Sequence, residues 1–441
     1  MRLLSPLLCL AFVFTACQND TAEEPDLPNQ LKISWGLLSN QFQSTPIQSE
    51  AYFILENQGK DSLTSGWEVH FNAFMGSILD IDPRFNIEHI DGDYYRLLPT
   101  AALKGLSPGQ QDTIHYTVTG TTIKEAMAPV GFFLVKDGAA YSVDWQNVPI
   151  GKSNAFGDFP LASVATYDEA EVLYDKYPDF IGSVVQSVVP QPAEVSFLAE
   201  GVRLAQVQSR SADSQSSGLG RFHVWTSGAL WSKPTKVFSE WLANFYGIEM
   251  VLHEEEKPTL PHLELIFDTN LPPERYEIFN LGPDLTVVSA SSEAGMQYGL
   301  ATVLQSLRLE GDYLTLPLEK VIDAPRFDYR GLHLDVSRNF HPKSSVLKLI
   351  DLMSLFKLNK FHFHLTDDEG WRLEIPDLPE LTSVGSNRGY TPNEEDHLHP
   401  SYGSGPTPGQ AYGSGYYSRQ DFIDIIKYAG ERQIEIIPEF D

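Results

Sequence analysis

The stretch "YRGLHLDVSRNFHPKSSVLKLIDLMSLFKLNKFHFHLTDDEGWR", residues 329–372, decides the fold of the C-terminal part of this chain. It opens with a short apolar strand pattern. Residues 344–358 then place apolar side chains at helical spacing, and residues 359–366 form a second strand pattern. A helix and a third apolar strand are expected within residues 418–440. Strand–helix–strand repeats with right-handed crossovers are typical of a (β/α) barrel or a parallel sheet, so the sequence predicts such a unit from about residue 326.

Polar side chains collect where the three predicted strands end. They are Asp335, Ser337 and Arg338 after the first strand, Thr366, Asp367 and Asp368 after the second, and Glu439 and Asp441 after the third. Barrel enzymes hold their active sites at this rim, so the clustering favours a functional site, with structural salt bridges as the alternative. An arginine among carboxylates presents a planar fork of donors that suits sugar hydroxyls or a carboxylate.

The segment "FHFHLTDDEGWR" allows three kinds of chemistry. His362 and His364 share one face of a strand, as a metal-binding pair would, but no further histidine follows the third strand. Hydrogen-bonded histidines that line a barrel are therefore the favoured interpretation, and no metal is expected. Asp368 and Glu369 suggest the carboxylate pair of a glycosidase. Neighbouring residues at a strand end point to opposite sides, however, so Asp367, Asp368 and Glu369 cannot all three converge.

The chain as a whole is predicted to be multidomain. Residues 30–150 read as short β-branched and aromatic strands separated by turns, which is typical of a β-sandwich. Residues 151–184 form a connector, and residues 185–325 mix strands and helices in an α+β pattern. Residues 326–441 then start the (β/α) unit.

Four tryptophans have two possible roles. Trp35, Trp67 and Trp145 in the predicted sandwich are either core residues, which is the more usual role, or a sugar-stacking platform. Trp371 is likewise either a sugar platform or the anchor of a loop.

Composition excludes some functional classes. The 441 residues include 42% hydrophobic and 20% charged residues, which are the proportions of a folded protein. The formal net charge is −28 and no Lys/Arg-rich run is present. A nucleic-acid partner is excluded on this ground, because a polyanion would be repelled.

The N-terminus predicts export. Residues 1–17, "MRLLSPLLCLAFVFTAC", have a positive start and an apolar run that is too short to span a membrane, as in a secretory signal. The ending "FTAC" resembles a bacterial lipobox, which would make Cys17 the lipidated first residue of a membrane-anchored lipoprotein; a plain signal peptide is the alternative. Residues 18–29 then form a polar tether. The only other cysteine, Cys9, lies within the signal, so no disulfide is expected.

Two segments, residues 329–389 and 417–441 ("YSRQDFIDIIKYAGERQIEIIPEFD"), resemble the opening of the catalytic domain of glycoside hydrolase family 20, the β-N-acetylhexosaminidases. Residues 185–325 resemble the α+β domain that precedes this barrel. The segment that begins "ISWGLLSN" is similar to the carbohydrate-binding-like domain of chitobiases. The resemblance implies removal of terminal non-reducing β-linked N-acetylglucosamine or N-acetylgalactosamine from oligosaccharides or glycoconjugates, with retention and without a cofactor.

The family also implies roles for residues of this sequence. Its nucleophile is the 2-acetamido oxygen of the substrate; an Asp stabilises the resulting oxazolinium, and a Glu acts as general acid and then base. Arg338 would bind hydroxyls of the non-reducing sugar, Asp367 would support the site together with a histidine in the loop after the third strand, and Asp441 would lie at the rim beside that loop. Two positions depart from the pattern: Asn339 stands where histidine is usual, and Glu369 where glutamine is common.

The family's Asp-Glu pair follows a fourth strand, and "IIPEFD" ends at Asp441 after the third. Residues 326–441 amount to roughly 115 residues, whereas a (β/α)₈ barrel takes about 250. We therefore expect the first three βα units of a TIM barrel, a catalytic pair beyond Asp441 and no activity of this chain alone. The alternatives are a non-catalytic sugar-binding lipoprotein and, third, a metal-dependent barrel hydrolase.

Overall fold

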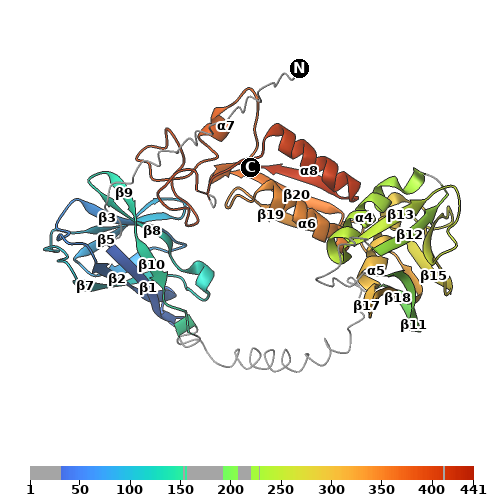
Figure 1. Cartoon of the computed structure of the whole chain (residues 1–441). Coiled ribbons are helices and arrows are strands. Elements are labelled where there is room, and N and C mark those ends of the chain that lie inside the picture. Colours follow the sequence, from blue (N-terminus) through green and yellow to red (C-terminus); the bar gives the residue numbers. More distant parts are fainter. Residues whose placement is uncertain (1–30, 152–153, 156–191, 207–219, 228, 411–412) are drawn as a thin grey trace, which may run out of the picture.

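The computed structural model describes residues 31–151, 154–155, 192–206, 220–227, 229–410 and 413–441. The predicted signal and tether, with Cys17, lie outside the described residues, as does most of the predicted connector. Three folded units form an arc, with the N-terminal sandwich at one end, the α+β domain at the other and the strands of the (β/α) unit between them (Figure 1). None of the helices in the described part of the chain has the length and apolar character needed to cross a bilayer.

The N-terminal unit is a sandwich of two five-stranded sheets. The first sheet, in the order β10-β1-β2-β7-β4, comprises β1 (Leu31–Gln41), β2 (Gln48–Asn57), β4 (Ile78–Ile81), β7 (Gln111–Thr119) and β10 (Asp144–Asn147). The second, in the order β5-β6-β3-β8-β9, comprises β3 (Trp67–Asn72), β5 (Phe85–Asp91), β6 (Tyr94–Pro99), β8 (Val130–Lys136) and β9 (Ala139–Ser142).

Side chains in the sandwich alternate between core and surface, as a sheet packed on one face requires. Trp35 and Trp67 are only 1% exposed and belong to the core, whereas Trp145 is 40% exposed and packs against Phe132. The core role expected for Trp35 and Trp67 is thus confirmed, and the two cannot form a sugar-stacking surface.

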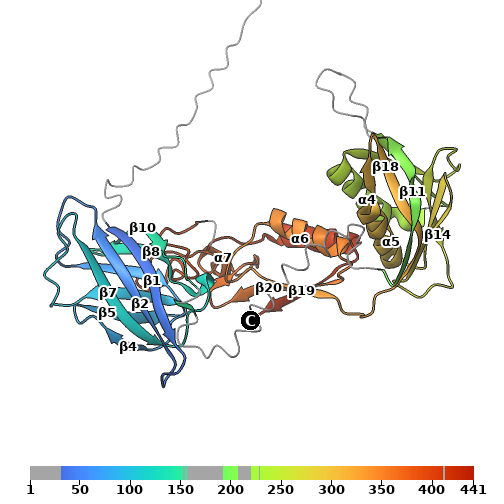
Figure 2. The same ribbon diagram turned by 90° about the horizontal axis from the view of Figure 1, so that it is seen from below.

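The α+β unit is built on an eight-stranded mixed sheet in the order β11-β18-β15-β16-β14-β12-β13, with β17 paired to β18. Its strands are β11 (Glu194–Gln206), β12 (Gly220–Thr226), β13 (Ile248–His253), β14 (His262–Phe267), β15 (Tyr276–Gly282), β16 (Leu285–Ala290), β17 (Arg308–Glu310) and β18 (Tyr313–Asp323). Helices α4 (Ser232–Tyr246) and α5 (Glu293–Ser306) pack side by side on one face of this sheet (Figure 2). Ser292 caps α5 by accepting a hydrogen bond from the backbone N–H of Gly295.

Residues 331–440 place three parallel strands side by side in the order β19-β20-β22. The strands are β19 (Gly331–Asp335), β20 (Lys360–Asp367) and β22 (Glu435–Phe440); α6 (Lys343–Leu355) and α8 (Arg419–Glu431) connect them. A two-residue strand β21 (Gly370–Trp371) folds back antiparallel on β20, and a short helix α7 (Glu380–Ser383) follows. Ser418 and Asp421 form a capping box at the start of α8.

The α+β unit packs against the helices of the (β/α) unit, residues 326–441, which is called the barrel unit from here on. Arg432 is buried and donates to Glu240 and Asp351 at 2.7 and 2.6 Å. Buried Lys357 donates to the hydroxyl of Tyr276 at 2.7 Å across the same boundary. These buried polar contacts fix the two units relative to one another.

Candidate active site

Arg338 lies at the centre of a carboxylate cluster at the carboxyl ends of β19 and β20. Its guanidinium pairs with Asp367, lies 3.2 Å from an oxygen of Asp335 (Nη1 to Oδ2) and 3.0 Å from an oxygen of Glu369 (Nε to Oε2). Burial alone would lower the pKa of Arg338, but the three carboxylates outweigh burial and raise it. The predicted rim position of Arg338 and Asp367 corresponds to a compact charged site.

Alternation along the chain explains which acids take part. Asp367 and Glu369, two residues apart, both face Arg338. Asp368 between them is exposed, and its backbone N–H donates to Asp367 at 2.8 Å. The acids are therefore not a facing Asp368–Glu369 pair, in agreement with the strand-parity argument. The structure adds what the sequence did not predict, which is that Glu369 also binds Arg338.

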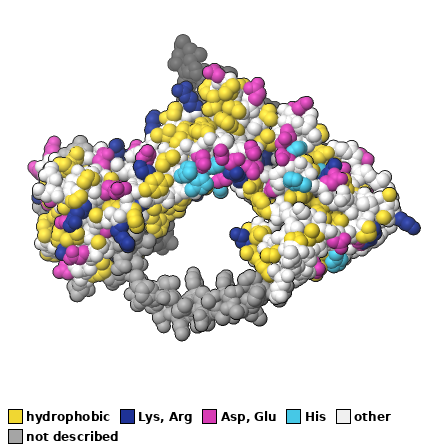
Figure 3. Space-filling view, turned by 180° about the vertical axis from the view of Figure 1, so that it is seen from behind, with side chains coloured by type: hydrophobic (Ala, Val, Ile, Leu, Met, Phe, Trp, Pro, Cys, Tyr) yellow, Lys and Arg dark blue, Asp and Glu magenta, His cyan; other side chains and the backbone are white. Residues whose placement is uncertain are grey.

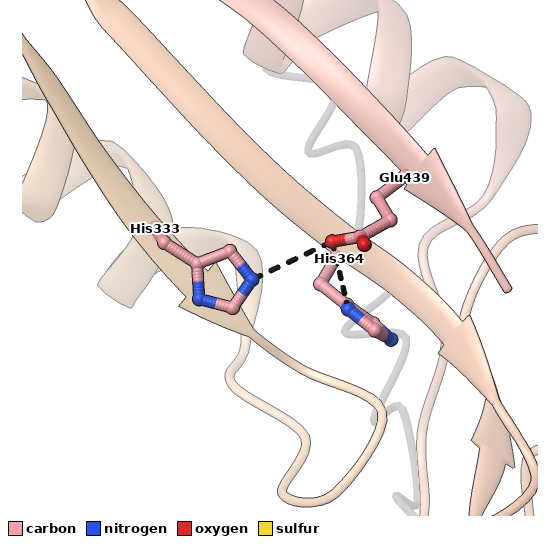
Figure 4. Close-up of side chains that lie close together, drawn as sticks. All are labelled: His333, His364 and Glu439. Atoms are coloured by element: carbon pink, nitrogen blue, oxygen red, sulfur yellow. Dashed lines mark ion pairs between the residues drawn. The ribbon is translucent and has the colours of Figure 1, made fainter.

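Three imidazoles surround the carboxylate of Glu439; His333, His362, His364 and Glu439 are here called the histidine cluster. The Glu439 oxygen lies 2.8 Å from His364 Nδ1 and 3.5 Å from His333 Nε2 (Figure 4). It also lies 2.8 Å from His362 Nε2. Burial raises the pKa of Glu439, but the facing His364 and His362 outweigh it, so the pKa lies below its ordinary value. Histidine and acidic side chains gather in the middle of the arc, on its inner side (Figure 3).

His364 joins the histidine cluster to the arginine. Its Nδ1 faces Glu439, and its Nε2 lies 3.0 Å from the Oδ2 of Asp367, the same oxygen that pairs with Arg338. Because both ring nitrogens of this buried imidazole face carboxylates, its orientation is fixed. The result is a continuous polar path from β22 through β20 to Arg338.

The histidine cluster also offers a donor set for a metal ion. Ligand atoms of His333, His364 and Glu439 all lie within 4.8 Å of one another, and imidazole with carboxylate is a donor set that suits zinc. In the structure the imidazoles face the same oxygen of Glu439 at ion-pair distances.

Two buried arginines build the loops around the site, and the sequence did not predict their role. Arg372 is 0% exposed and donates to backbone carbonyls of Val336, Ser337, Ser386, Gly413 and Gly415. Arg388 donates to the carbonyls of Ser337, Arg338, Glu369 and Ser401. Burial lowers the pKa of Arg372 to about 9 and that of Arg388 to about 10. Both guanidiniums therefore hold the loop after β19, which carries Arg338.

The remaining predicted positions lie around this site. The indole N–H of Trp371 donates to the carbonyl of Leu373 at 2.5 Å, so Trp371 anchors its loop. Asp441 is exposed, and its backbone N–H donates to the carbonyl of Thr366 at 3.3 Å, which places it beside the end of β20. Asn339 is exposed next to Arg338.

Comparison with known proteins agrees with this architecture. Residues 327–441 match the family model "Glycosyl hydrolase family 20, catalytic domain", and residues 37–155 match "Putative carbohydrate binding domain". N,N'-diacetylchitobiase of Vibrio harveyi is 30% identical over 410 residues, which are 88% of this chain and 42% of that protein. A β-hexosaminidase of Vibrio vulnificus is 28% identical over 445 residues, covering 93% of this chain and 49% of that protein. The chain thus spans less than half the length of these curated relatives.

The crystal structure of a GH20 exo β-N-acetylglucosaminidase from Vibrio harveyi in complex with N-acetylglucosamine superposes with a TM-score of 0.72. The match covers 93% of this chain and 57% of that chain at 22% identity, which establishes a shared fold. The sandwich, the α+β unit and the rim site together have the multidomain architecture of this structural neighbour. Through residues 327–441, the chain belongs to glycosyl hydrolase family 20.

Proposed function

We propose that the protein is a β-N-acetylhexosaminidase that releases terminal non-reducing β-linked N-acetylglucosamine or N-acetylgalactosamine. The observation that carries the proposal is the Arg338 fork, held by Asp335, Asp367 and Glu369 at the rim of family 20 strands. A planar guanidinium whose direction is fixed by carboxylates suits a pair of sugar hydroxyls. The names of the two relatives, a chitobiase and a hexosaminidase, support the same substrate class.

The proposed reaction is substrate-assisted and retaining. The oxygen of the substrate's 2-acetamido group attacks the anomeric carbon while a carboxylic acid protonates the leaving oxygen; water then opens the oxazolinium with the same residue as base. Arg338 holds the non-reducing sugar, and Asp367 is a supporting residue held by His364. Asp441 belongs to the rim without an assigned step.

The acid and the oxazolinium-stabilising Asp are inferred to lie outside residues 326–441. Within the described residues of this unit, the rim carboxylates of Asp335, Asp367 and Glu369 contact Arg338, and that of Glu439 contacts histidines. These four carboxylates therefore each face a cationic or imidazole partner, whereas Asp368 and Asp441 of the same rim are exposed and have no assigned step. The proposal predicts that the 441-residue chain alone does not hydrolyse an aryl N-acetyl-β-glucosaminide.

The test is an NMR assay of the released sugar. The gene product that carries residues 1–441 should release the β-anomer first, as a retaining enzyme does, whereas the purified 441-residue chain should release none. First release of the α-anomer would contradict the substrate-assisted mechanism, and turnover by the 441-residue chain would contradict the placement of the catalytic pair. Binding of N-acetylglucosamine by the gene product without turnover would favour the alternative, a non-catalytic sugar-binding lipoprotein.

We also propose export and a lipid anchor at Cys17, on the strength of the N-terminal pattern in residues 1–17. The mature protein should begin at Cys17 and carry acyl chains detectable by intact mass. Replacement of Cys17 with Ser should move the protein from the membrane to the soluble fraction. A membrane fraction unchanged in the Cys17→Ser variant would contradict the anchor.

A further inference from the structure

The N-terminal sandwich grips a segment of the barrel unit, although the two lie some 300 residues apart in sequence. The loop between α7 and α8 lies beside β8 and β9 of the sandwich (Figure 1). Buried Asn72, at the end of β3, makes two bonds to this loop: its side-chain N–H donates to the carbonyl of Pro400 at 2.9 Å, and its side-chain oxygen accepts from the N–H of Gly403 at 3.0 Å. One amide side chain thus binds a backbone carbonyl and a backbone N–H of the same short turn.

Asp93 completes the grip from the turn between β5 and β6. Its carboxylate is 7% exposed and uses both oxygens: one accepts from the hydroxyl of Ser401 at 2.8 Å, the other from the N–H of Tyr402 at 2.9 Å. Tyr402 adopts a left-handed backbone with φ of 51°, which costs a non-glycine residue energy. Anchoring on both sides of Tyr402 explains how this conformation persists, and its ring also packs against Phe74 of the sandwich at 5.6 Å.

The two backbones also meet without side chains between them. Gly131 in β8 has φ of 67°, and a Cβ added there would lie 2.6 Å from the Cα of Gly403. Such a separation is shorter than any van der Waals contact, so only glycine permits this approach. The segment 400–403 is therefore held by shape as well as by hydrogen bonds.

A single buried guanidinium connects the gripped segment to the sugar-binding arginine. Arg388 donates from Nη1 to the carbonyls of Ser401 at 3.2 Å and Arg338 at 2.8 Å. It also donates from Nε to the carbonyl of Glu369 at 2.6 Å. The sandwich holds Ser401 through Asp93. The Arg388 guanidinium binds the carbonyl of Ser401 and also the carbonyls of Arg338 and Glu369.

We propose that the N-terminal sandwich is a positioning element of the sugar site: Asn72, Asp93 and Gly131 fix segment 400–403, and Arg388 passes that constraint to Arg338. The sandwich thereby sets the affinity for the N-acetylhexosaminide whose hydroxyls Arg338 binds. This deepens the proposed function and rests on it for the identity of the sugar. The sandwich residues then affect sugar binding without contacting the sugar, because they fix the backbone that positions Arg338.

Gly131→Ala is the variant that separates this proposal from a general loss of stability. Its methyl group meets the backbone of Gly403, whereas Gly138→Ala in the same sandwich puts a methyl group at φ of 82° with nothing within 4 Å. Both glycines have a left-handed backbone, so the two substitutions carry a similar backbone strain. Only Gly131→Ala displaces segment 400–403, so the difference between the two variants reports the contact itself.

The first readout needs neither sugar nor activity. In the 441-residue chain, Gly131→Ala should speed amide hydrogen exchange in residues 399–404 about tenfold, the effect of losing roughly 1.4 kcal/mol of local stability. It should also raise the rate at which phenylglyoxal modifies Arg338, measured by peptide mass spectrometry. Gly138→Ala should change neither. Asp93→Asn removes the charge and should act in the same direction as Gly131→Ala.

In Gly131→Ala, faster amide exchange in residues 399–404 with unchanged labelling of Arg338 would overturn the coupling through Arg388. Unchanged exchange in these residues would overturn the claim that the sandwich holds segment 400–403. In the gene product, Gly131→Ala should raise KM for an aryl N-acetyl-β-glucosaminide with kcat largely retained, and Gly138→Ala should not. Failure of the gene product to bind or hydrolyse any N-acetylhexosaminide would refute the proposed function. The labelling result would stand in that case, so the two failures are distinguishable.

Discussion

Replacing buried Arg372 with Met should lower the stability of the barrel unit more than replacing an exposed arginine with Met. Five backbone carbonyls accept hydrogen bonds from this guanidinium at 2.8–3.2 Å, with no solvent contact. At about 1.5 kcal/mol for each bond to a charged donor, these bonds contribute roughly 7 kcal/mol. Burial, together with the nearby charge of Arg388, lowers the pKa of Arg372 from 12.5 to about 9, which corresponds to roughly 5 kcal/mol against the charged form. The net loss on substitution is therefore about 2–3 kcal/mol.

Native-state hydrogen exchange measures this locally, because three domains do not unfold in one transition. In Arg372→Met, the amides of β20 should exchange about 30- to 150-fold faster, whereas those of β2 in the sandwich should be unchanged. Arg419→Met, on the exposed start of α8, is the matched control and should change exchange less than about twofold. A change below about threefold in β20 for Arg372→Met would refute the reasoning, because the five carbonyls would then not depend on the guanidinium.

Three further predictions concern charge and metal. Glu369→Gln should lower KM for an aryl N-acetyl-β-glucosaminide about two- to fivefold in the gene product, because a partly exposed ion pair worth about 0.5–1 kcal/mol no longer competes for Arg338; a raised KM would contradict this. Burial lowers the pKa of Lys357 from 10.5 to about 8, so the unfolded chain binds more protons between these values and stability rises with pH. Between pH 7.5 and 9.5 the wild type should gain about 2 kcal/mol relative to Lys357→Met, and parallel pH curves would refute the assignment. EDTA should leave the unfolding temperature unchanged to within about 1 °C, whereas stoichiometric zinc with loss of stability on chelation would show that the histidine cluster is a metal site.

Much of the barrel unit was predictable because its signals are local. The alternation of "FHFH" fixes β20, and the parity argument that paired His362 with His364 on one face is confirmed by their common contact with Glu439. Ser418 and Asp421 define the start of α8 within three residues of each other.

Elements with weak local signals were missed. Helix α4 starts after Trp231, which makes no side-chain capping bond, and carries Pro234 in its first turn. Strand β4 has only four residues (Ile78–Ile81), two of them exposed. Such segments are stabilised by packing against distant parts of the chain rather than by propensity.

The candidate site was predicted only in part for the same reason. Arg338 and Asp367 come at or just after the ends of predicted strands, so their position in the sequence was enough to predict that they lie at the rim. Arg372 and Arg388 bind backbone carbonyls, which every residue has, so no side-chain pattern marks their partners. The contact of Asp93 with Tyr402 spans 309 residues and arises only when two domains meet.

The most direct test of the proposed function is the dependence of hydrolysis on the acetamido group. The gene product that carries residues 1–441 should release p-nitrophenol from p-nitrophenyl N-acetyl-β-D-glucosaminide and should cleave p-nitrophenyl β-D-glucoside at least about a thousandfold more slowly, because the glucoside lacks the internal nucleophile. Arg338→Met should abolish most of the activity on the N-acetylated substrate through a raised KM. Comparable rates on the two substrates, or no effect of Arg338→Met, would contradict a substrate-assisted hexosaminidase whose sugar is held by Arg338.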